Sequence, residues 1–75
     1  MENVNTMAKK NYIELPAEQR KSMIEQRLIQ YKQQIFSLQM DRAALESVED
    51  CEGIKSIDQR IEAIRKAYSA VERMM

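Results

Sequence analysis

The chain of 75 residues has no histidine and no tryptophan, and it contains one cysteine, one glycine and one proline. Without histidine, the commonest metal ligand and the usual general base at neutral pH are both missing. A lone cysteine, Cys51, cannot close an intramolecular disulfide, which removes one means of stabilising a small domain. These absences predict a protein that is not an enzyme and that uses neither a metal nor another cofactor.

Long apolar runs and an excess of one charge are also absent. No stretch approaches the ~20 predominantly apolar positions of a membrane-spanning helix. The 12 basic residues are balanced by 12 acidic residues, which argues against a protein that binds duplex nucleic acid by displacing counterions from phosphates. The single thiol and the lack of an apolar leader segment favour the reducing cytoplasm.

Between Pro16 and Gly53 the chain has neither glycine nor proline, and it is rich in strong helix formers. Because proline is well tolerated at the first position of a helix, we expect an N-terminal arm over residues 1–15 and a first helix over 16–48. Apolar residues in this helix alternate four and three positions apart, the spacing of a coiled-coil seam. The seam residues are Ile24, Leu28, Tyr31, Ile35, Leu38, Arg42 and Leu45, and only Arg42 is polar.

A polar segment over residues 49–53 contains the only glycine and predicts a turn. The second helix is then expected over residues 54–75. Its seam residues step by three and four positions: Ile54, Ile57, Ile61, Ile64, Tyr68, Val71 and Met75. Two helices joined by so short a turn pack antiparallel. The fold class predicted is therefore all-α, a coiled-coil-like two-helix antiparallel hairpin, in which Asp58 or Glu62 can accept the guanidinium of Arg42.

One hairpin does not shield all of the apolar surface. A stripe of apolar residues lies roughly opposite the first seam, since positions advance by ~100° per residue, and such a stripe predicts a partner. We expect a homo-oligomer, either a homodimeric four-helix bundle or a larger ring. Its interface is predicted at Met23, Ile29, Phe36, Met40, Ala67 and Ala70. Alternatively, Ile29 and Phe36 pack against the N-terminal arm of their own chain.

Cations gather around the start of the first helix: Lys9, Lys10, Arg20, Lys21 and Arg27. Together with the free amides of a helix N-terminus, they could hold a phosphate. Tyr12 offers an aromatic ring on which a base could stack. In the alternative interpretation, Tyr12 and Leu15 form a hydrophobic lid over the longer helix and the cations are ordinary solvated charges.

The segment Tyr12-Ile13-Glu14-Leu15, followed by Met23 and Arg27, resembles the entry to the hairpin of phage proteins that sequester cyclic nucleotides made by bacterial anti-viral systems. The similarity covers about sixteen residues. It implies an oligomer of hairpins with pockets between chains, located in the host cytoplasm. Tyr12 would stack on a base and Arg27 would pair with a phosphate, while Arg65 or Arg73 of a neighbouring chain would join the pocket.

Two functions follow from these observations. The first is a non-catalytic oligomeric hairpin that binds a partner protein, as an adaptor, assembly or inhibitor module. The second is a phage-type sponge that sequesters cyclic-nucleotide signals at Tyr12, Arg20, Arg27, Arg65 and Arg73. A ligand that binds only the folded state raises the melting temperature, so a response to cyclic nucleotides would distinguish them.

Overall fold

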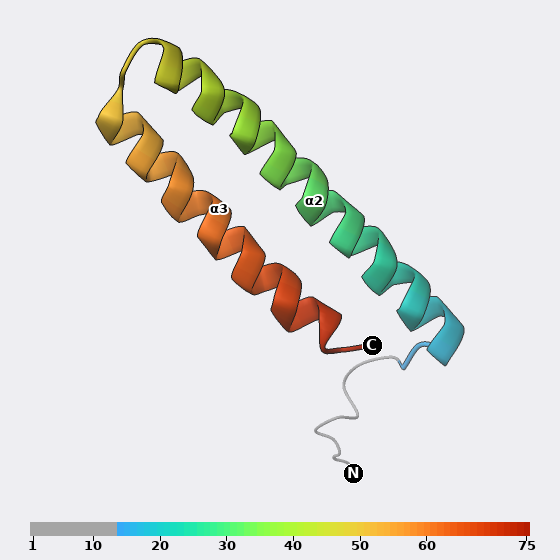
Figure 1. Ribbon diagram of the computed structural model, residues 1–75. Helices are drawn as coiled ribbons and strands as arrows, with labels where there is room; N and C mark the ends of the chain where they lie inside the picture. Colours follow the sequence, from blue (N-terminus) through green and yellow to red (C-terminus); the bar gives the residue numbers. More distant parts are fainter. Residues whose placement is uncertain (1–13) are drawn as a thin grey trace.

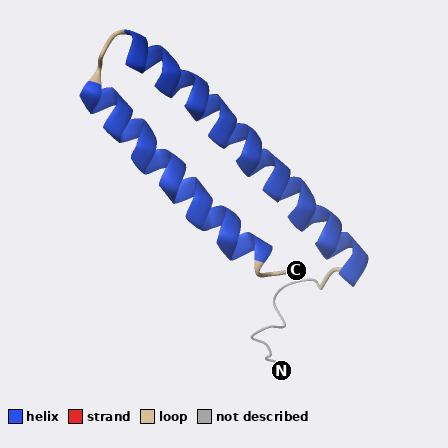
Figure 2. Ribbon diagram, viewed as in Figure 1, coloured by secondary structure: helices blue, strands red, loops and turns tan. Residues whose placement is uncertain are grey.

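The computed structural model describes residues 14–75 of the chain. In this part of the chain there are two helices and no strand: α2, Ala17–Ser47, and α3, Cys51–Glu72. They lie side by side as a hairpin, and the end of α3 returns toward the beginning of α2 (Figure 1). Outside the short turn almost all of the described chain is helical (Figure 2). The predicted two-helix antiparallel hairpin is confirmed.

α2 begins directly after Pro16, as the sequence predicts, and the amide of Arg20 donates the first helical hydrogen bond to the Pro16 carbonyl (3.0 Å). Pro16 has no amide hydrogen to leave unpaired and its φ of −54° suits a helix start. Glu18 places a negative charge in the first turn, where the helix dipole favours it. Among residues 14–75, no side chain caps this end of the helix.

The helices meet along the predicted seam. From Ile24 to Val71, every seam residue is buried or half-buried, and Leu28, Leu38 and Ile57 form the buried core. Met75, the last predicted seam residue, lies beyond the end of α3 and is exposed. The alternation of three and four positions therefore identified the contact faces correctly, but the hairpin encloses very few of these side chains fully.

The turn is shorter than predicted, because α3 begins at Cys51 and not at residue 54. Glu49 adopts a left-handed conformation with φ 57°. The amide of Asp50 bonds the carbonyl of Leu45 (3.0 Å) and the amide of Glu49 bonds that of Glu46 (3.1 Å). This pair of bonds is the Schellman motif, which satisfies the last carbonyls of a helix. Chain reversal thus needs only residues 48–50.

Gly53 lies inside α3 with a negative φ, so the prediction that it supplies the turn is wrong. Its role is spatial. The carboxylate of Asp50 caps α3 by accepting a hydrogen bond from the Gly53 amide (3.0 Å). A Cβ at position 53 would lie 2.6 Å from Oδ2 of Asp50 and 2.9 Å from Cδ1 of Leu45. The missing side chain therefore makes room for the cap and for the last seam leucine of α2.

Arg42 is the polar member of the seam, and it joins the two helices. Its Nε donates to Oδ1 of Asp58 (2.7 Å) and its Nη2 donates to Oδ2 (3.2 Å), while Nη1 donates to Oε2 of Glu46 (2.6 Å). Of the two acceptors predicted for Arg42, Asp58 and Glu62, the structure shows Asp58. The hydrogen bond from Arg42 lowers the pKa of Asp58, and the hydrogen bond and charge of Asp58 raise the pKa of Arg42.

The described hairpin is elongated and thin, with principal extents of 61 × 23 × 14 Å. Its radius of gyration is 18.5 Å, whereas a compact chain of this length would have about 11 Å. A single layer of two helices cannot enclose a core from both sides. Most seam side chains are therefore only half-buried, and the opposite faces of both helices are open.

Candidate binding surfaces

The open end of the hairpin forms a groove with a volume of about 860 Å³. It arises because α2 continues past the level at which α3 ends. Apolar side chains make most of its walls and three cations line it as well. The lining residues are Leu15, Ala17, Arg20, Lys21, Met23, Ile24, Arg27, Val71, Met74 and Met75.

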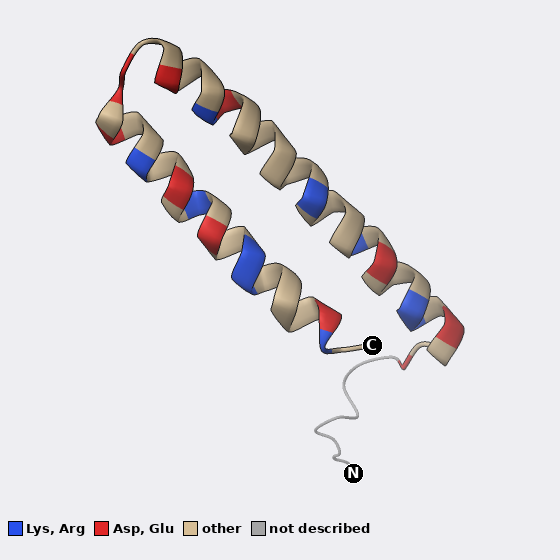
Figure 3. Ribbon diagram, in the orientation of Figure 1, with Lys and Arg blue, Asp and Glu red and all other residues tan. Residues whose placement is uncertain are grey.

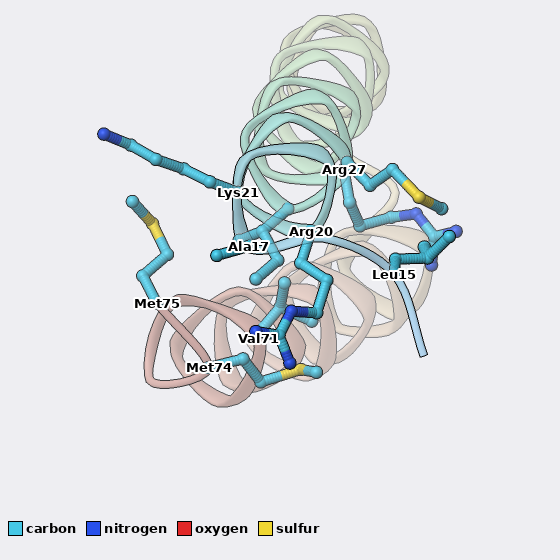
Figure 4. A pocket seen from close by; sticks show the side chains of 10 residues that line it. Leu15, Ala17, Arg20, Lys21, Arg27, Val71, Met74 and Met75 are labelled. Atoms are coloured by element: carbon cyan, nitrogen blue, oxygen red, sulfur yellow. The ribbon is translucent and has the colours of Figure 1, made fainter. Parts of the chain in front are cut away.

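Two residues of the predicted ligand site, Arg20 and Arg27, come together in this groove. In Figure 4, Arg20 lies between the helices beside Val71 and Met74, whereas Lys21 points away. Neither arginine takes part in an ion pair within residues 14–75. Guanidinium groups on an apolar floor suit an anionic ligand that also has an apolar or aromatic part.

The other predicted ligand residues are not in this groove. Tyr12 lies outside the described residues. Arg65 lines a separate hollow of about 350 Å³ farther along the hairpin, together with Lys32, Ile35, Tyr68 and Ser69. Arg73 is the C-terminal cap residue of α3 and lines neither hollow. One hairpin alone does not assemble the predicted cation cluster.

The smaller hollow contains a contact between Lys32 and Tyr68 that was not predicted from the sequence. Lys32 Nζ lies 5.8 Å from the centroid of the Tyr68 ring, within the range of a cation–π interaction. The signal was present in the sequence, since Lys32 directly follows seam residue Tyr31 and antiparallel pairing brings it to the level of Tyr68. Met74 is a second missed contributor, this time to the groove at the open end.

A second surface lies on the side of α2 that faces away from α3. We call it the outer face, and all of its residues are exposed. Three are large apolar residues: Ile29 is 49% exposed, Met40 54% and Phe36 61%. The outer face consists of Ser22, Gln26, Ile29, Gln33, Phe36, Met40, Ala43 and Ser47.

From Gln26 to Ser47 no charged residue points in the direction of the outer face, although nine of the 31 residues of α2 carry a charge. Glu18 and Glu25 point in this direction only near the start of the helix. Figure 3 shows the middle of α2 as a stretch without charge between Lys32 and Asp41. Solvated helix faces usually carry charges, and interface cores are depleted in them. The outer face therefore has the composition of a contact surface.

The remaining predicted interface residues lie elsewhere. Met23 lines the groove at the open end and is exposed. Ala67 is half-buried on α3 and Ala70 is exposed. Three of the six predicted interface residues, Ile29, Phe36 and Met40, thus share one helix face, whereas Met23 and the alanines do not.

The described residues show no group of three or more cysteine or acidic side chains that could hold a metal ion. Neither α2 nor α3 is long and apolar enough to cross a membrane. Comparison with protein-family models, with curated proteins and with solved structures finds no match to this chain. The groove at the open end and the outer face are therefore the features that indicate a function.

Proposed function

We propose that this chain is a non-catalytic, oligomeric helical hairpin that acts by binding a partner protein, as an adaptor, assembly or inhibitor module. The observation that carries this proposal is the outer face of α2, which presents Ile29, Phe36 and Met40 to solvent without a charged residue among them. Exposed apolar patches bordered by polar residues are typical of protein–protein contact sites.

The small core supports the same proposal. Among the described residues only Leu28, Leu38 and Ile57 are buried, and domains of this size commonly need oligomerisation or another form of stabilisation. Association through the outer face would remove apolar surface from water at about 25 cal/mol per Å². It would therefore supply stability that the isolated hairpin lacks.

Light scattering over a concentration series tests this proposal. The expected result is a mass above that of one chain, falling on dilution, and a Phe36→Glu variant that remains monomeric, because a charge would be buried at the contact. Gln59→Glu is the matched control, since it adds the same charge at an exposed position of α3. A wild-type chain that is monomeric and stably folded at every concentration would contradict the proposal.

The groove at the open end favours a second candidate function, sequestration of a cyclic nucleotide. Arg20 and Arg27 lie on an apolar surface there, and the groove is open to solvent at the end of the hairpin. Phosphate oxygens could pair with the guanidinium groups. Tyr12, which resembles the stacking residue of the phage proteins, and Arg65 or Arg73 of another copy would complete such a pocket.

A melting experiment with a panel of cyclic nucleotides tests this second function. A binding ligand at a hundred times its Kd stabilises the folded state by about 2.7 kcal/mol, which raises Tm by several degrees. Arg27→Ala and Tyr12→Ala should each lose the shift, whereas Arg60→Ala, which removes a cation outside both hollows, should keep it. No shift with any cyclic nucleotide would exclude the sponge function.

A further inference from the structure

The outer face lies almost directly opposite the helix that α2 already contacts. At ~100° per residue, the mean direction of the outer-face residues is roughly 160° from that of the α2 seam. A molecule bound to the outer face would therefore pack against α2 alone, on the side away from α3. Such a contact extends the hairpin sideways and does not close it into a four-helix bundle.

The composition of the outer face suits a second copy of the same chain. In a two-fold contact every residue faces residues of its own surface, so a charged surface would place like charges together. The outer face avoids this because all eight of its residues are uncharged. Its large apolar members, Ile29, Phe36 and Met40, also lie in the central part of α2, where a two-fold axis can bring them together.

Charges along one edge of the outer face distinguish the possible registers. Four exposed residues lie along this edge at intervals of seven positions, and three of them are charged: Glu25, Lys32, Gln39 and Glu46. When two α2 helices run antiparallel with Phe36 beside Met40 of the second copy, Lys32 lies beside Glu46 of that copy. This register forms two opposite-charge pairs, one on each side of the axis.

The registers that move the contact toward the start of α2 are less favourable. Moving the second helix by one heptad in one direction pairs Met40 with Ile29 but places Glu25 beside Glu46. A further heptad places Lys32 beside its own counterpart. Like charges at such a distance destabilise a helix contact by about as much as opposite charges stabilise it.

The groups needed for the ion pair are accessible in the hairpin. Glu46 uses Oε2 to accept from Arg42, and within the described residues Oε1 has no hydrogen-bond partner. Its side chain is 55% exposed. Lys32 is exposed and rests over the Tyr68 ring at 5.8 Å, an interaction that is weak at exposed sites. Rotation of this side chain toward a carboxylate of the second copy would therefore cost little.

We infer that two copies pair through their outer faces with the α2 helices antiparallel, Phe36 against Met40 and Lys32 against Glu46 of the second copy. The product is one layer of four helices in the order α3, α2, α2, α3. The contact is about 28 Å long, from Ile29 to Ser47 at ~1.5 Å per residue. This inference rests on the proposed oligomeric function and specifies its partner and geometry.

Charge reversal tests the register. The dimer Kd of Lys32→Glu, of Glu46→Lys and of the double variant is measured by sedimentation equilibrium, with helix content from circular dichroism confirming the fold. Each single reversal should raise Kd about tenfold, because two attractive pairs become repulsive. The double variant should return to within about threefold of the wild type. Lys66→Glu, on the outer side of α3, should leave Kd unchanged.

Glu46→Lys also removes the hydrogen bond between Arg42 and Glu46 within one chain. Disulfide cross-linking therefore provides a second test of the register that leaves Glu46 unchanged. In a Cys51→Ser background, Gln39→Cys lies next to its counterpart near the proposed axis and should form a disulfide dimer on mild oxidation, whereas Gln26→Cys should not. Cross-linking at both positions would indicate parallel helices and overturn the inference. An oligomer whose Kd ignores both charge reversals would overturn the register while leaving the proposed function intact. A wild-type monomer would overturn both.

Discussion

The two opposite faces of α2 follow the same spacing of three and four residues, yet only one of them is covered. The seam face contains large aliphatic side chains at nearly every step, and α3 packs against it with Leu38 only 6% exposed. The outer face alternates large apolar residues with serine and glutamine, and it stays open. The spacing of three and four residues therefore indicates which faces of α2 can contact another helix. Within the hairpin, α3 covers only the more apolar of the two faces.

The turn decides which face of α2 meets α3. A Schellman motif at Leu45–Asp50 and the Asp50 cap of α3 fix the direction in which the chain leaves one helix and enters the next. Arg42 and Asp58 then hold the two helices in register along the seam. These contacts leave the outer face for another molecule.

The largest expected difference between the two faces concerns Leu38 and Phe36. Leu38→Ala should lower the free energy of unfolding by about 2 kcal/mol or more, because it opens a cavity in the seam. Phe36→Ala should cost less than about 0.5 kcal/mol in dilute protein, since that ring is 61% exposed in the hairpin. Urea unfolding below the concentration of self-association measures both. Equal losses would mean that the outer face is covered by its own chain, as in the alternative in which Ile29 and Phe36 pack against the N-terminal arm.

Removal of the α3 cap should have the next largest effect. Asp50→Ala leaves the Gly53 amide without its acceptor and should cost about 1 kcal/mol. Asp50→Ser is the matched control, because a serine hydroxyl can accept the same hydrogen bond. Thermal or urea unfolding that shows no difference between alanine and serine would contradict the assignment of this cap.

Much of the fold could be predicted from the sequence because it depends on local signals and on periodicity. Pro16 marked the start of α2, and the repeated isoleucines of α3 marked its seam. Arg42 was expected to pair with Asp58 or Glu62, and Asp58 is its partner on α3. The turn was mispredicted because glycine was taken as the residue with positive φ. Glu49 adopts that conformation instead, stabilised by two hydrogen bonds that sequence alone does not show.

The candidate sites were predictable to a smaller extent. Arg20 and Arg27 share a groove because they lie seven positions apart, on one helix face. Arg65 and Arg73 were expected to join the pocket from a neighbouring chain, and within one hairpin neither of them lines that groove. Met74 also lines the groove, a role that was not predicted from the sequence. The length by which α2 extends past the end of α3 depends on the residues at which the turn begins and ends. Periodicity does not determine these residues.

Glu49→Gly should raise the free energy of unfolding, whereas the substitutions above lower it. A left-handed conformation is costly for a residue with a Cβ and free of that strain for glycine. The variant should therefore gain about 0.5 to 1 kcal/mol in the free energy of unfolding, with Glu49→Ala as a control that keeps the Cβ. A loss of stability with glycine would show that the turn is built differently.

The smallest effect is expected for the pH-dependent contribution of the Arg42–Asp58 ion pair to stability. Because Arg42 lowers the pKa of Asp58, this carboxylate stabilises the fold above its unfolded pKa of ~3.9. The contribution is lost as the pH falls through the lower folded value. Asp58→Asn should thus lower Tm by a few degrees at most at pH 7, since both partners are exposed, and the difference should vanish near pH 2. A difference that persists in strong acid would contradict the ion pair as its cause.

Self-association through the outer face is tested most directly by the mass of the wild-type chain in solution. Sedimentation equilibrium measures this mass and that of the Phe36→Glu variant under the same conditions. A wild-type dimer that dissociates on dilution, with a monomeric and still helical Phe36→Glu variant, is the expected result. A stable wild-type monomer, or a dimer whose Kd is the same in both proteins, would contradict it.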